Sequence, residues 1–458
     1  MAIAETGASE LLGEHAGGGG GGADSPPNDA PPPSYWEVVG DGPGGCDRPQ
    51  DAHNGASPPY PKTAPTGMEV SQPAPGEVRF VKALTAMRPL YIHAEKVASS
   101  SLIVERDPNA GSRDLVVVRV EFSGGETDIW GKCKVTMEPN DKDEYEIHAA
   151  GKRVGWGTPT LRCRFVVLVS PAAEVRHPGI RAKLCNGHAG LGDLQNADFD
   201  IIEIGATNTS VLLSHINGGS IRVKTDGGEI EARNVTAQNI VSLRTRGARV
   251  LMRKVCSPQL HAATTDALVS LRRSFGEEVD IRTTNARVSC VESNAGSLRI
   301  KAKGTLISVA GSTAQTMRLA TTDAPIVGKW RVENLLEAST TSKEIEGRVE
   351  LVDPSGQAAI SLATTNAPIR VALPDGVFCG QLDLKTVAGV VGIGRARNSS
   401  GSPLPLYLSL DTEPHKRGML GTGSDIQHSL TARTTGQNIQ VRFVDPKAVR
   451  PAQSSPRS

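Results

Sequence analysis

The sequence predicts an all-β protein, most of which is a parallel β-solenoid, a stack of short strands wound one rung upon the next. Two observations carry this prediction. Hydrophobic residues make up 38% of the chain but aromatic residues only 3%, so aliphatic side chains must fill the core, which favours sheets over helix packing. A ten-residue phrase also recurs, as LATTDAPIVG at 319–328 and LATTNAPIRV at 362–371, and such self-similarity is typical of repeat architectures.

Residues 1–76 form an acidic, Gly- and Pro-rich tail. It contains a hexaglycine run at 17–22 and carries ten acidic side chains against two basic ones, a net charge of −8. A segment of this composition buries too little apolar surface to offset the entropy lost on ordering, so we expect it to be disordered. We expect the same of the short tail at 446–458.

One short motif in the tail suggests a partner. Pro32, Pro33 and Tyr35 belong to a PPSY sequence, a match to the PPxY pattern that WW domains bind in a polyproline II conformation. The alternative interpretation is a chance match in a proline-rich tail, and the sequence leaves both open.

Residues 77–180 are expected to form a β-rich module that leads into the repeat and covers its first exposed edge. Strand-like runs occur at 115–122 (LVVVRVEF), 132–138 (KCKVTME), 144–149 (EYEIHA) and 162–169 (RCRFVVLV), separated by turn-rich segments. Their spacing is irregular, so this region shows no repeat.

Residues 181–445 contain the repeat, which is anchored on the first threonine of each phrase. Successive anchors lie about nineteen residues apart. They are Ala206, Thr225, Thr245, Thr264, Thr283, Ala302, Thr321, Thr340 and Thr364, followed by Thr386 and Thr434 in two later phrases. About eleven rungs are therefore expected, with a Ser/Pro-rich excursion at 396–418 that forms either a loop or a cap.

Apolar residues stand at fixed places around each anchor. Four residues before it are Ile202, Ile221, Val241, Leu260, Val279, Leu298, Met317, Leu336 and Ile360, and five residues after it are Val211, Ile230, Val250, Val269, Val288, Ile307, Ile326, Ile345 and Ile369. The position two residues before the anchor is apolar as well, and this period of two indicates a strand with one buried face.

A turn is expected between the two strands of each unit. Two residues past the anchor stand Asn208, Gly227, Gly247, Asp266, Asn285, Gly304, Asp323, Ser342 and Asn366. Gly, Asn and Asp tolerate positive φ, so this column predicts a left-handed turn residue stacked from rung to rung. A unit this small cannot bury its apolar face alone and must stack on its neighbours.

These columns, together with LPDGVFCGQLDLKTVAGVV at 373–391, resemble the bacterial "putative adhesin" β-solenoid families of unknown function and similar uncharacterised fungal proteins with proline-rich tails. The resemblance covers roughly 180–445. It implies a β-solenoid fold and no catalytic residues, because the shared pattern is structural.

No cofactor, metal or catalytic motif stands out. The sequence contains no GxxxxGK[ST], GxSxG or HExxH pattern. Its seven cysteines are scattered without CxxC spacing, so free thiols are expected. The first residues lack the basic and apolar regions of a secretory signal, and no apolar run is long enough for a membrane span. We therefore expect a non-enzymatic, cytoplasmic protein.

Three turn carboxylates raise the alternative of a carbohydrate-active β-helix, either a polysaccharide hydrolase, a lyase or a binding protein. Asp266 and Asp323 lie three rungs apart, about 14 Å, and Asp226 and Asp266 lie two rungs apart, near 10 Å. Hydrolysis needs about 5 to 9.5 Å between its two carboxyl groups. Turn chemistry explains all three residues without catalysis.

Basic residues beside the anchors predict a face for an anionic partner. They are Arg222, Lys224, Arg244, Arg282, Arg299, Lys301 and Arg318, and on stacked strands they would share one outer face. The alternative is that they only keep the sheet soluble. Nucleic acid is disfavoured, because almost no aromatic residue accompanies them to stack on bases. The sequence thus favours a scaffold or interaction protein.

Overall fold

The computed structural model describes residues 69–71, 77–83, 88–107, 115–123, 133–151, 161–169, 176–192, 194, 197–398, 400–422 and 427–445. All of them belong to one of the two units into which the chain divides, Pro58–Ser458. Every regular element in this part of the chain is a strand, and none of its segments is a helix long and apolar enough to cross a membrane. Pro32, Pro33 and Tyr35 lie outside the described residues.

The strands fall into three groups along the chain. The first comprises β1 (Glu69–Ser71), β2 (Glu77–Ala83), β3 (Leu90–Glu95), β4 (Ser99–Arg106), β5 (Leu115–Ser123), β6 (Cys133–Pro139), β7 (Tyr145–Gly151), β8 (Arg162–Val169) and β9 (Arg176–His177). The second comprises β10 (Ile180–Cys185), β11 (His188–Leu191), β12 (Asp198–Thr207), β13 (Ser210–Asp226), β14 (Ile230–Arg244), β15 (Val250–Cys256), β16 (Gln259–Thr264), β17 (Val269–Arg272), β18 (Phe275–Thr284), β19 (Val288–Val291), β20 (Asn294–Lys303), β21 (Ile307–Thr321), β22 (Ile326–Thr340), β23 (Ile345–Leu351), β24 (Ala359–Thr364) and β25 (Ile369–Pro374). The third comprises β26 (Gly380–Lys385), β27 (Val391–Ile393), β28 (Leu406–Asp411), β29 (His415–Leu420), β30 (His428–Arg433) and β31 (Ile439–Val444).

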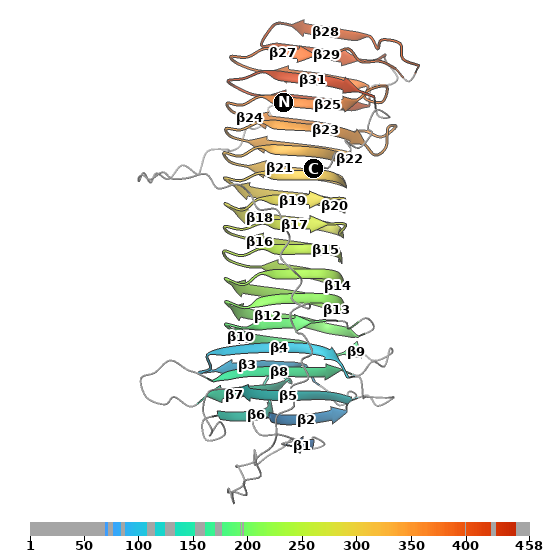
Figure 1. Cartoon of the computed structure of the whole chain (residues 1–458). Coiled ribbons are helices and arrows are strands. Elements are labelled where there is room, and N and C mark those ends of the chain that lie inside the picture. The colour runs from blue at the N-terminus through green and yellow to red at the C-terminus, as the bar shows by residue number, and fades with distance from the viewer. Residues whose placement is uncertain are drawn as a thin grey trace, which may run out of the picture. The chain divides into compact units, whose positions relative to one another are not determined.

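Parallel pairing between successive repeats builds two main ladders and a short third one, which contains pairs such as Cys256 with Phe275 and Phe275 with Asn294. Figure 1 shows the strands stacked one above another. Ladder A contains the strands that end at the anchors, and β12, β13, β14, β16 and β18 follow one another in it. Ladder B contains the strands that follow the turns, such as β15, β17 and β19. The long strands β13, β14, β21 and β22 run through both ladders.

The registers pair the residues of the predicted columns. Ile202 lies opposite Ile221 in ladder A, and Ile307 lies opposite Ile326 in ladder B. No member of either column is more than 2% exposed. Aliphatic side chains therefore stack directly upon one another through the core, which is why a step of nineteen residues preserves the alternation between buried and exposed faces.

The anchor threonines are buried, and all of them except Thr283 hydrogen bond to a turn carbonyl. The hydroxyl of Thr264 donates to the carbonyl of Ala248 at 2.7 Å, and that of Thr340 donates to the carbonyl of Ala324 at 2.9 Å. Each bond joins the end of one strand to the turn sixteen residues earlier, in the preceding repeat. The recurring threonine is thus a structural device that satisfies a turn carbonyl.

The turn column is left-handed at six of its nine predicted positions. Asn208, Gly227, Gly247, Asn285, Gly304 and Asp323 have positive φ. Asp266, Ser342 and Asn366 lie outside the left-handed region, so the prediction was wrong for these three. The turns around Ser342 and Asn366 flank the insertion at 353–356, which lengthens one repeat.

A second left-handed column lies at another corner of the stack. It contains His215, Asn234, Lys254, Arg273, Glu292 and Gly311, with φ between 49° and 65°. Side-chain contacts run along it, since Arg273 Nε donates to Glu292 at 2.7 Å. Lys, Arg and Glu are unusual at positive φ, so nothing in their residue types marked this turn in the sequence.

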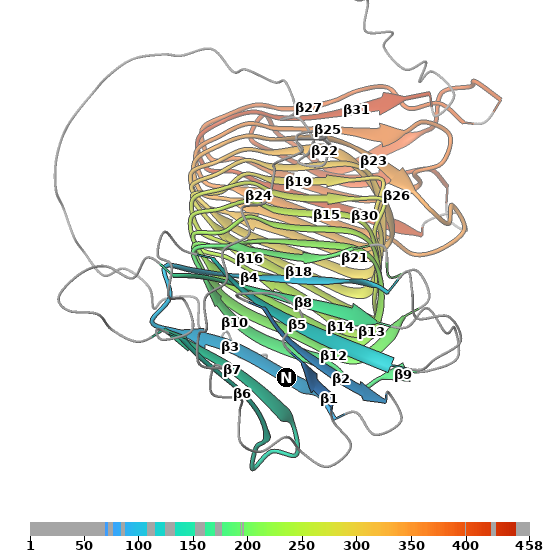
Figure 2. The ribbon, with the colours of Figure 1, turned by 60° about the horizontal axis from the view of Figure 1, so that its bottom comes forward.

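The N-terminal end of the stack begins earlier than expected. β3 and β4 already pair in parallel with β10 and β11, and β7 and β8 pair in parallel with β3 and β4 on the outside. Antiparallel strands then cover both ladders, β6 on β7 in ladder A and β5, β2 and β1 on β8 in ladder B. Figure 2, with this end turned forward, shows these strands together. β1 falls within the segment expected to be disordered, and its pairing with β2 orders those three residues.

The C-terminal end does not follow chain order. β30 lies between β24 and β26, and β31 lies between β25 and β27. The last two strands of the chain therefore occupy the place next to the repeat at 359–374, and the strands at 380–393 lie outside them. The excursion between them supplies β28 and β29, an antiparallel hairpin that pairs with β26 and covers the end of ladder A.

Candidate functional site

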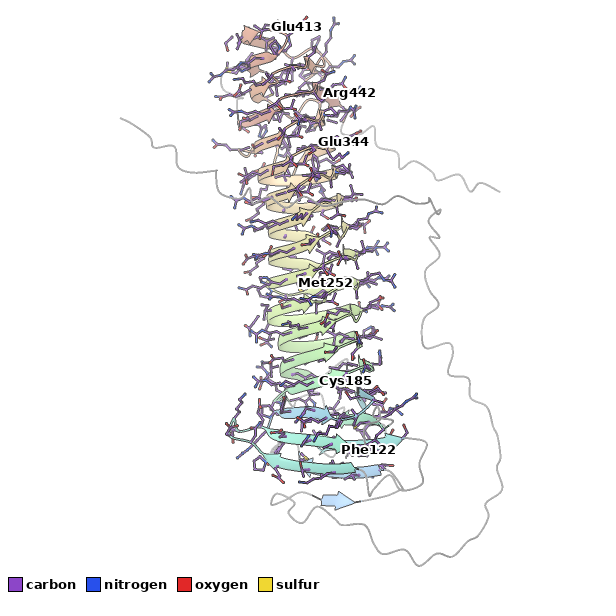
Figure 3. The ribbon with its side chains drawn as sticks, turned by 90° about the vertical axis from the view of Figure 1, so that its left-hand side faces the viewer. Phe122, Cys185, Met252, Glu344, Glu413 and Arg442 are labelled. Carbon is purple, nitrogen blue, oxygen red and sulfur yellow. The ribbon has the colours of Figure 1, made fainter. Side chains whose placement is uncertain are left out.

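The predicted basic residues lie on the outer face of ladder A, where side chains project away from the strands all along the stack (Figure 3). They form two groups. Lys224 and Arg244 are register partners, as are Arg299 and Arg318, and Arg282 and Lys301. Between the groups stand the uncharged partners Ser242, His261 and Ala263, so these residues do not form one continuous stripe.

Two members of this set have acidic partners. Arg282 pairs with Asp280 at 2.7 Å, and Arg318 pairs with Glu337 at 2.9 Å. The hydrogen bond to Asp280 also raises the pKa of Arg282. Arg222, Lys224, Arg244, Arg299 and Lys301 have no carboxylate within ion-pair distance in the described part of the chain.

A denser basic cluster lies on ladder B and was missed in the sequence. Arg233, Arg253 and Arg272 are register partners on three successive strands, and Lys254 follows Arg253. All four are exposed. Arg233 pairs with Glu231 on its own strand, whereas Arg253, Lys254 and Arg272 have no carboxylate within ion-pair distance among the described residues. The charge of Arg272 still contributes to lowering the pKa of Glu292. We call these four residues the ladder B cluster. Their spacing of 20 and then 19 residues was a usable signal, eight positions after the anchors Thr225, Thr245 and Thr264.

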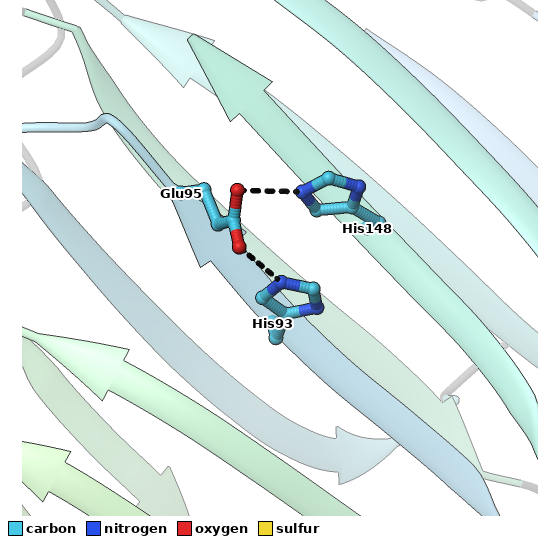
Figure 4. Close-up of side chains that lie close together, drawn as sticks. All are labelled: His93, Glu95 and His148. Carbon is cyan, nitrogen blue, oxygen red and sulfur yellow. Dashed lines mark hydrogen bonds and ion pairs between the residues drawn. The ribbon is translucent and has the colours of Figure 1, made fainter.

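A histidine cluster lies near the N-terminal end, on the outer face of ladder A (Figure 4). His93 on β3 and His148 on β7 are register partners, and their rings stack with centroids 4.3 Å apart at an interplanar angle of 6°. Glu95 lies two residues beyond His93. Its carboxylate oxygens lie 3.3 Å from His93 Nε2 and 3.7 Å from His148 Nε2. Parallel pairing brings these residues together, so their spacing in the sequence gave no sign of it.

The local charges set the protonation of this cluster. A hydrogen bond from His93 and the charge of His148 lower the pKa of Glu95. Burial, followed by the charge of His93, lowers the pKa of His148. At neutral pH the cluster therefore presents a carboxylate beside a neutral imidazole of His148.

The turn carboxylates act in local structure. Asp266 accepts a hydrogen bond from the Asn285 amide at 3.2 Å, and Asp323 accepts one from Ser342 at 2.6 Å. Both bonds link turns of successive repeats, which is the role that turn chemistry predicts for these residues.

A groove of about 580 Å³ lies at the C-terminal end, over β26, β28, β29 and β30. Gln381, Asp383, Tyr407 and Thr431 are among the residues that line it. His415 Nε2 lies 2.9 Å from Asp383. Burial alone would raise the pKa of Asp383, but the hydrogen bond from His415 and the charges of Arg433 and Arg417 outweigh burial and lower it.

Comparison with known proteins gives little beyond this geometry. No protein-family model matches the chain, and no curated protein matches it. One similar solved structure is described as a "putative cell adhesion protein" from Clostridium sporogenes. It shares 9% identity with this chain over 80% of this chain and 99% of its own length, with a TM-score of 0.21.

Proposed function

We propose that this chain is a non-enzymatic β-solenoid scaffold that binds an acidic protein partner on its basic outer faces. The parallel registers support a solenoid with the eleven rungs expected from the repeat and three more formed by β7 with β8, β3 with β4 and β10 with β11. A solenoid offers long, regular surfaces to partners. A location in the cytoplasm stays a prediction.

The ladder B cluster is the observation that carries the proposal. Arg233, Arg253 and Arg272 place like charges on neighbouring strands, about 4.8 Å apart along the ladder. Like charges directly opposite one another destabilise a sheet. The exposed guanidinium groups of these three arginines are suited to carboxylates, which guanidinium groups bind in a bidentate manner. Five further cations without acidic partners on ladder A, Arg222, Lys224, Arg244, Arg299 and Lys301, give the same charge to a second face.

The test compares two double variants of the full chain that change net charge equally. Arg253→Gln with Arg272→Gln removes two cations without acidic partners, whereas Arg249→Gln with Arg318→Gln removes two that pair with Glu229 and Glu337. Binding of a fluorescent polyglutamate peptide is measured by anisotropy at two salt concentrations. We expect the first variant to bind roughly three- to tenfold more weakly and the second to bind nearly as wild type. Equal weakening, or preferential binding of duplex DNA over the peptide, contradicts the proposal.

We further propose that the tail binds a WW-domain protein through Pro32, Pro33 and Tyr35. These residues lie outside the described part of the chain, so the proposal rests on the PPSY sequence alone. A peptide of residues 25–65 is titrated against a panel of WW domains. Tyr35→Ala should abolish binding and Tyr60→Ala should not, because SPPYP lacks the full motif. Equal sensitivity to both changes would make the match a coincidence.

Carbohydrate binding is a second candidate function, favoured by the C-terminal groove. Tyr407 is 57% exposed in this groove, which the polar Gln381 and Thr431 also line, and an exposed ring in a groove with hydrogen-bonding groups suits a sugar. Hydrolysis needs two carboxyl groups, and Asp383 is the one carboxylate among the described lining residues. Titration of soluble oligosaccharides against wild type and Tyr407→Ala tests this function. Binding that the substitution does not weaken would exclude the groove.

A further inference from the structure

The histidine cluster on β3 and β7 provides donor atoms of the kind that bind transition metals. The donor atoms of His93, Glu95 and His148 all lie within 4.8 Å of one another. Two imidazoles with one carboxylate form a common protein ligand set for zinc and for other first-row metals. Neither the recurring anchors nor the proposed binding of an acidic partner uses these residues.

The distances suit a single ion. Metal bonds of 2.0 to 2.2 Å in a tetrahedral site place neighbouring donor atoms roughly 3.3 to 3.6 Å apart. Glu95 lies 3.3 Å from His93 Nε2 and 3.7 Å from His148 Nε2. The two imidazole rings are stacked with an interplanar angle of 6°, so binding one ion through both Nε2 atoms requires at least one ring to rotate out of the stack. The Glu95 side chain is 53% exposed and has room to follow that rotation.

Two nitrogen atoms of the cluster lack hydrogen-bond partners among the described residues. His93 Nδ1 and His148 Nε2 are buried and accept or donate no hydrogen bond among the described residues. A metal ion would satisfy His148 Nε2 directly. His93 Nδ1 lies 3.5 Å from a Glu146 carboxylate oxygen. In many metal sites a carboxylate in this position orients the metal-bound histidine.

Charged residues surround the histidine cluster, and one side of the cluster faces solvent. Lys96 and Lys134 are close enough to act on the cluster electrostatically. Lys183, the register partner of His93, lies over the Tyr91 ring at 5.8 Å. Two carboxylates, Glu95 and Glu146, offset the charge of a divalent cation. Since the cluster faces solvent, at least one coordination position remains for water or another donor.

We propose that His93 Nε2, His148 Nε2 and the Glu95 carboxylate bind one divalent transition-metal ion of the Zn²⁺, Ni²⁺ and Cu²⁺ class. Imidazole ligands select these ions over Mg²⁺ and Ca²⁺, which prefer oxygen donors. The ion joins β3 to β7, two strands separated by about fifty residues in the chain. It therefore fastens the outermost parallel strand of ladder A to its neighbour.

The test uses the full chain without a histidine tag, after treatment with chelator. Titration calorimetry with ZnCl₂ should show one ion per chain for wild type, with affinity lowered at least tenfold in His148→Ala and Glu95→Gln. His261→Ala, which removes a histidine from the outer face of ladder A outside the cluster, should bind as wild type. MgCl₂ should give no saturable signal.

A second measurement separates binding from folding. Zn²⁺ should raise the melting temperature of wild type and of His261→Ala but not that of Glu95→Gln, because an ion that binds only the folded state stabilises it. Glu95→Gln alters an exposed side chain and should fold normally. Absence of saturable zinc binding to wild type, or equal binding by Glu95→Gln, His148→Ala and wild type, would overturn the proposal.

Discussion

At the scale of single residues, the recurring threonine has a physical explanation. Its hydroxyl reaches the turn of the neighbouring repeat, as from Thr340 to the Ala324 carbonyl. A buried hydrogen bond of this kind contributes about 1 kcal/mol. Thr283 is buried in the same column, yet its hydroxyl has no hydrogen-bond partner among the described residues. Threonine therefore stabilises the fold at one repeat and, where its buried hydroxyl has no partner, destabilises it at another.

This contrast gives a prediction with an internal control. Thr340→Val keeps the shape of the side chain but removes the hydrogen bond, and we expect the free energy of unfolding to fall by about 1 kcal/mol. Thr283→Val removes a buried hydroxyl without a partner, so it should leave stability unchanged or raise it. Urea unfolding of both variants and wild type checks this. A larger loss from Thr283→Val would contradict the assigned contacts.

His177 predicts a dependence of stability on acid. Its side chain is 3% exposed and stacks on Phe199, and burial lowers its pKa to about 4, although Asp198 opposes this shift. In the unfolded chain its pKa is near 6.5. Protons therefore bind the unfolded state first, so this contribution to stability is present above pH 6.5 and is lost as the pH falls toward 4.

The expected loss between pH 7 and pH 5 is roughly 2 kcal/mol from this residue. His177→Leu removes the titration, so its free energy of unfolding should fall less over that interval than that of wild type. Denaturant unfolding at both pH values measures the difference. Parallel pH profiles for the two proteins would show that His177 titrates normally in the folded state.

At the scale of elements, Trp330 on β22 shows how one repeat accommodates a large side chain. Trp330 is fully buried, and Gly328 and Gly347, register partners on β22 and β23, make room for it. A Cβ on Gly347 would lie 2.4 Å from the Trp330 ring. The aromatic core residue and its two glycines form one packing unit across adjacent strands.

Gly347→Ala should therefore destabilise the protein by about 1 to 3 kcal/mol through overpacking. Gly392→Ala is the matched control, because a Cβ there meets no atom within 4 Å. It should be neutral or slightly stabilising. Thermal melts of both variants test the pair. Similar shifts for the two would mean that both the Trp330 ring and the Gly328 carbonyl, 2.6 Å from the added Cβ, can move aside.

The elements also show what sequence alone can establish. The alternation around residues such as Ile326 and Met317 fixed both buried columns, because a strand with one buried face must alternate. The second left-handed column at Lys254 and Arg273 could not be predicted from the sequence, because tertiary packing holds those residues in a conformation that their side chains do not favour. The histidine cluster could not be predicted either, because pairing between strands far apart in the sequence brings its residues together.

At the scale of the described unit, chain order and spatial order differ at both ends. Residues 380–393 and 428–444 share the same alternation. The sequence therefore could not reveal that β30 lies between β24 and β26 and that β31 lies between β25 and β27. Ile439 is fully buried with Ile369 on one side and Val391 on the other. Local pattern specifies a rung but not its neighbours.

Removal of these strands should affect everything outside them. A chain that ends at residue 427 lacks β30 and β31, and we expect β26 to β29 to detach and to become the first site of limited proteolysis. A chain that ends at residue 445 keeps every described strand and should be cleaved as slowly as wild type. Mass spectrometry of the fragments identifies the first cuts. Protection of residues 380–420 in the shorter chain would show that β26 can pair with β24 directly.

The position of β30 and β31 also imposes a delay during synthesis. About 70 residues separate Pro374 from Val444, which a ribosome adds in roughly 4 to 14 s at about 5 to 20 residues per second. During that time β24 and β25 present open edges, and β26 and β27 emerge first with an alternation that fits them. Docking there would occupy the place that belongs to β30 and β31. The nascent chain must therefore either keep this edge open or release an early mispairing, so the last strands made determine whether the ones before them are correctly placed.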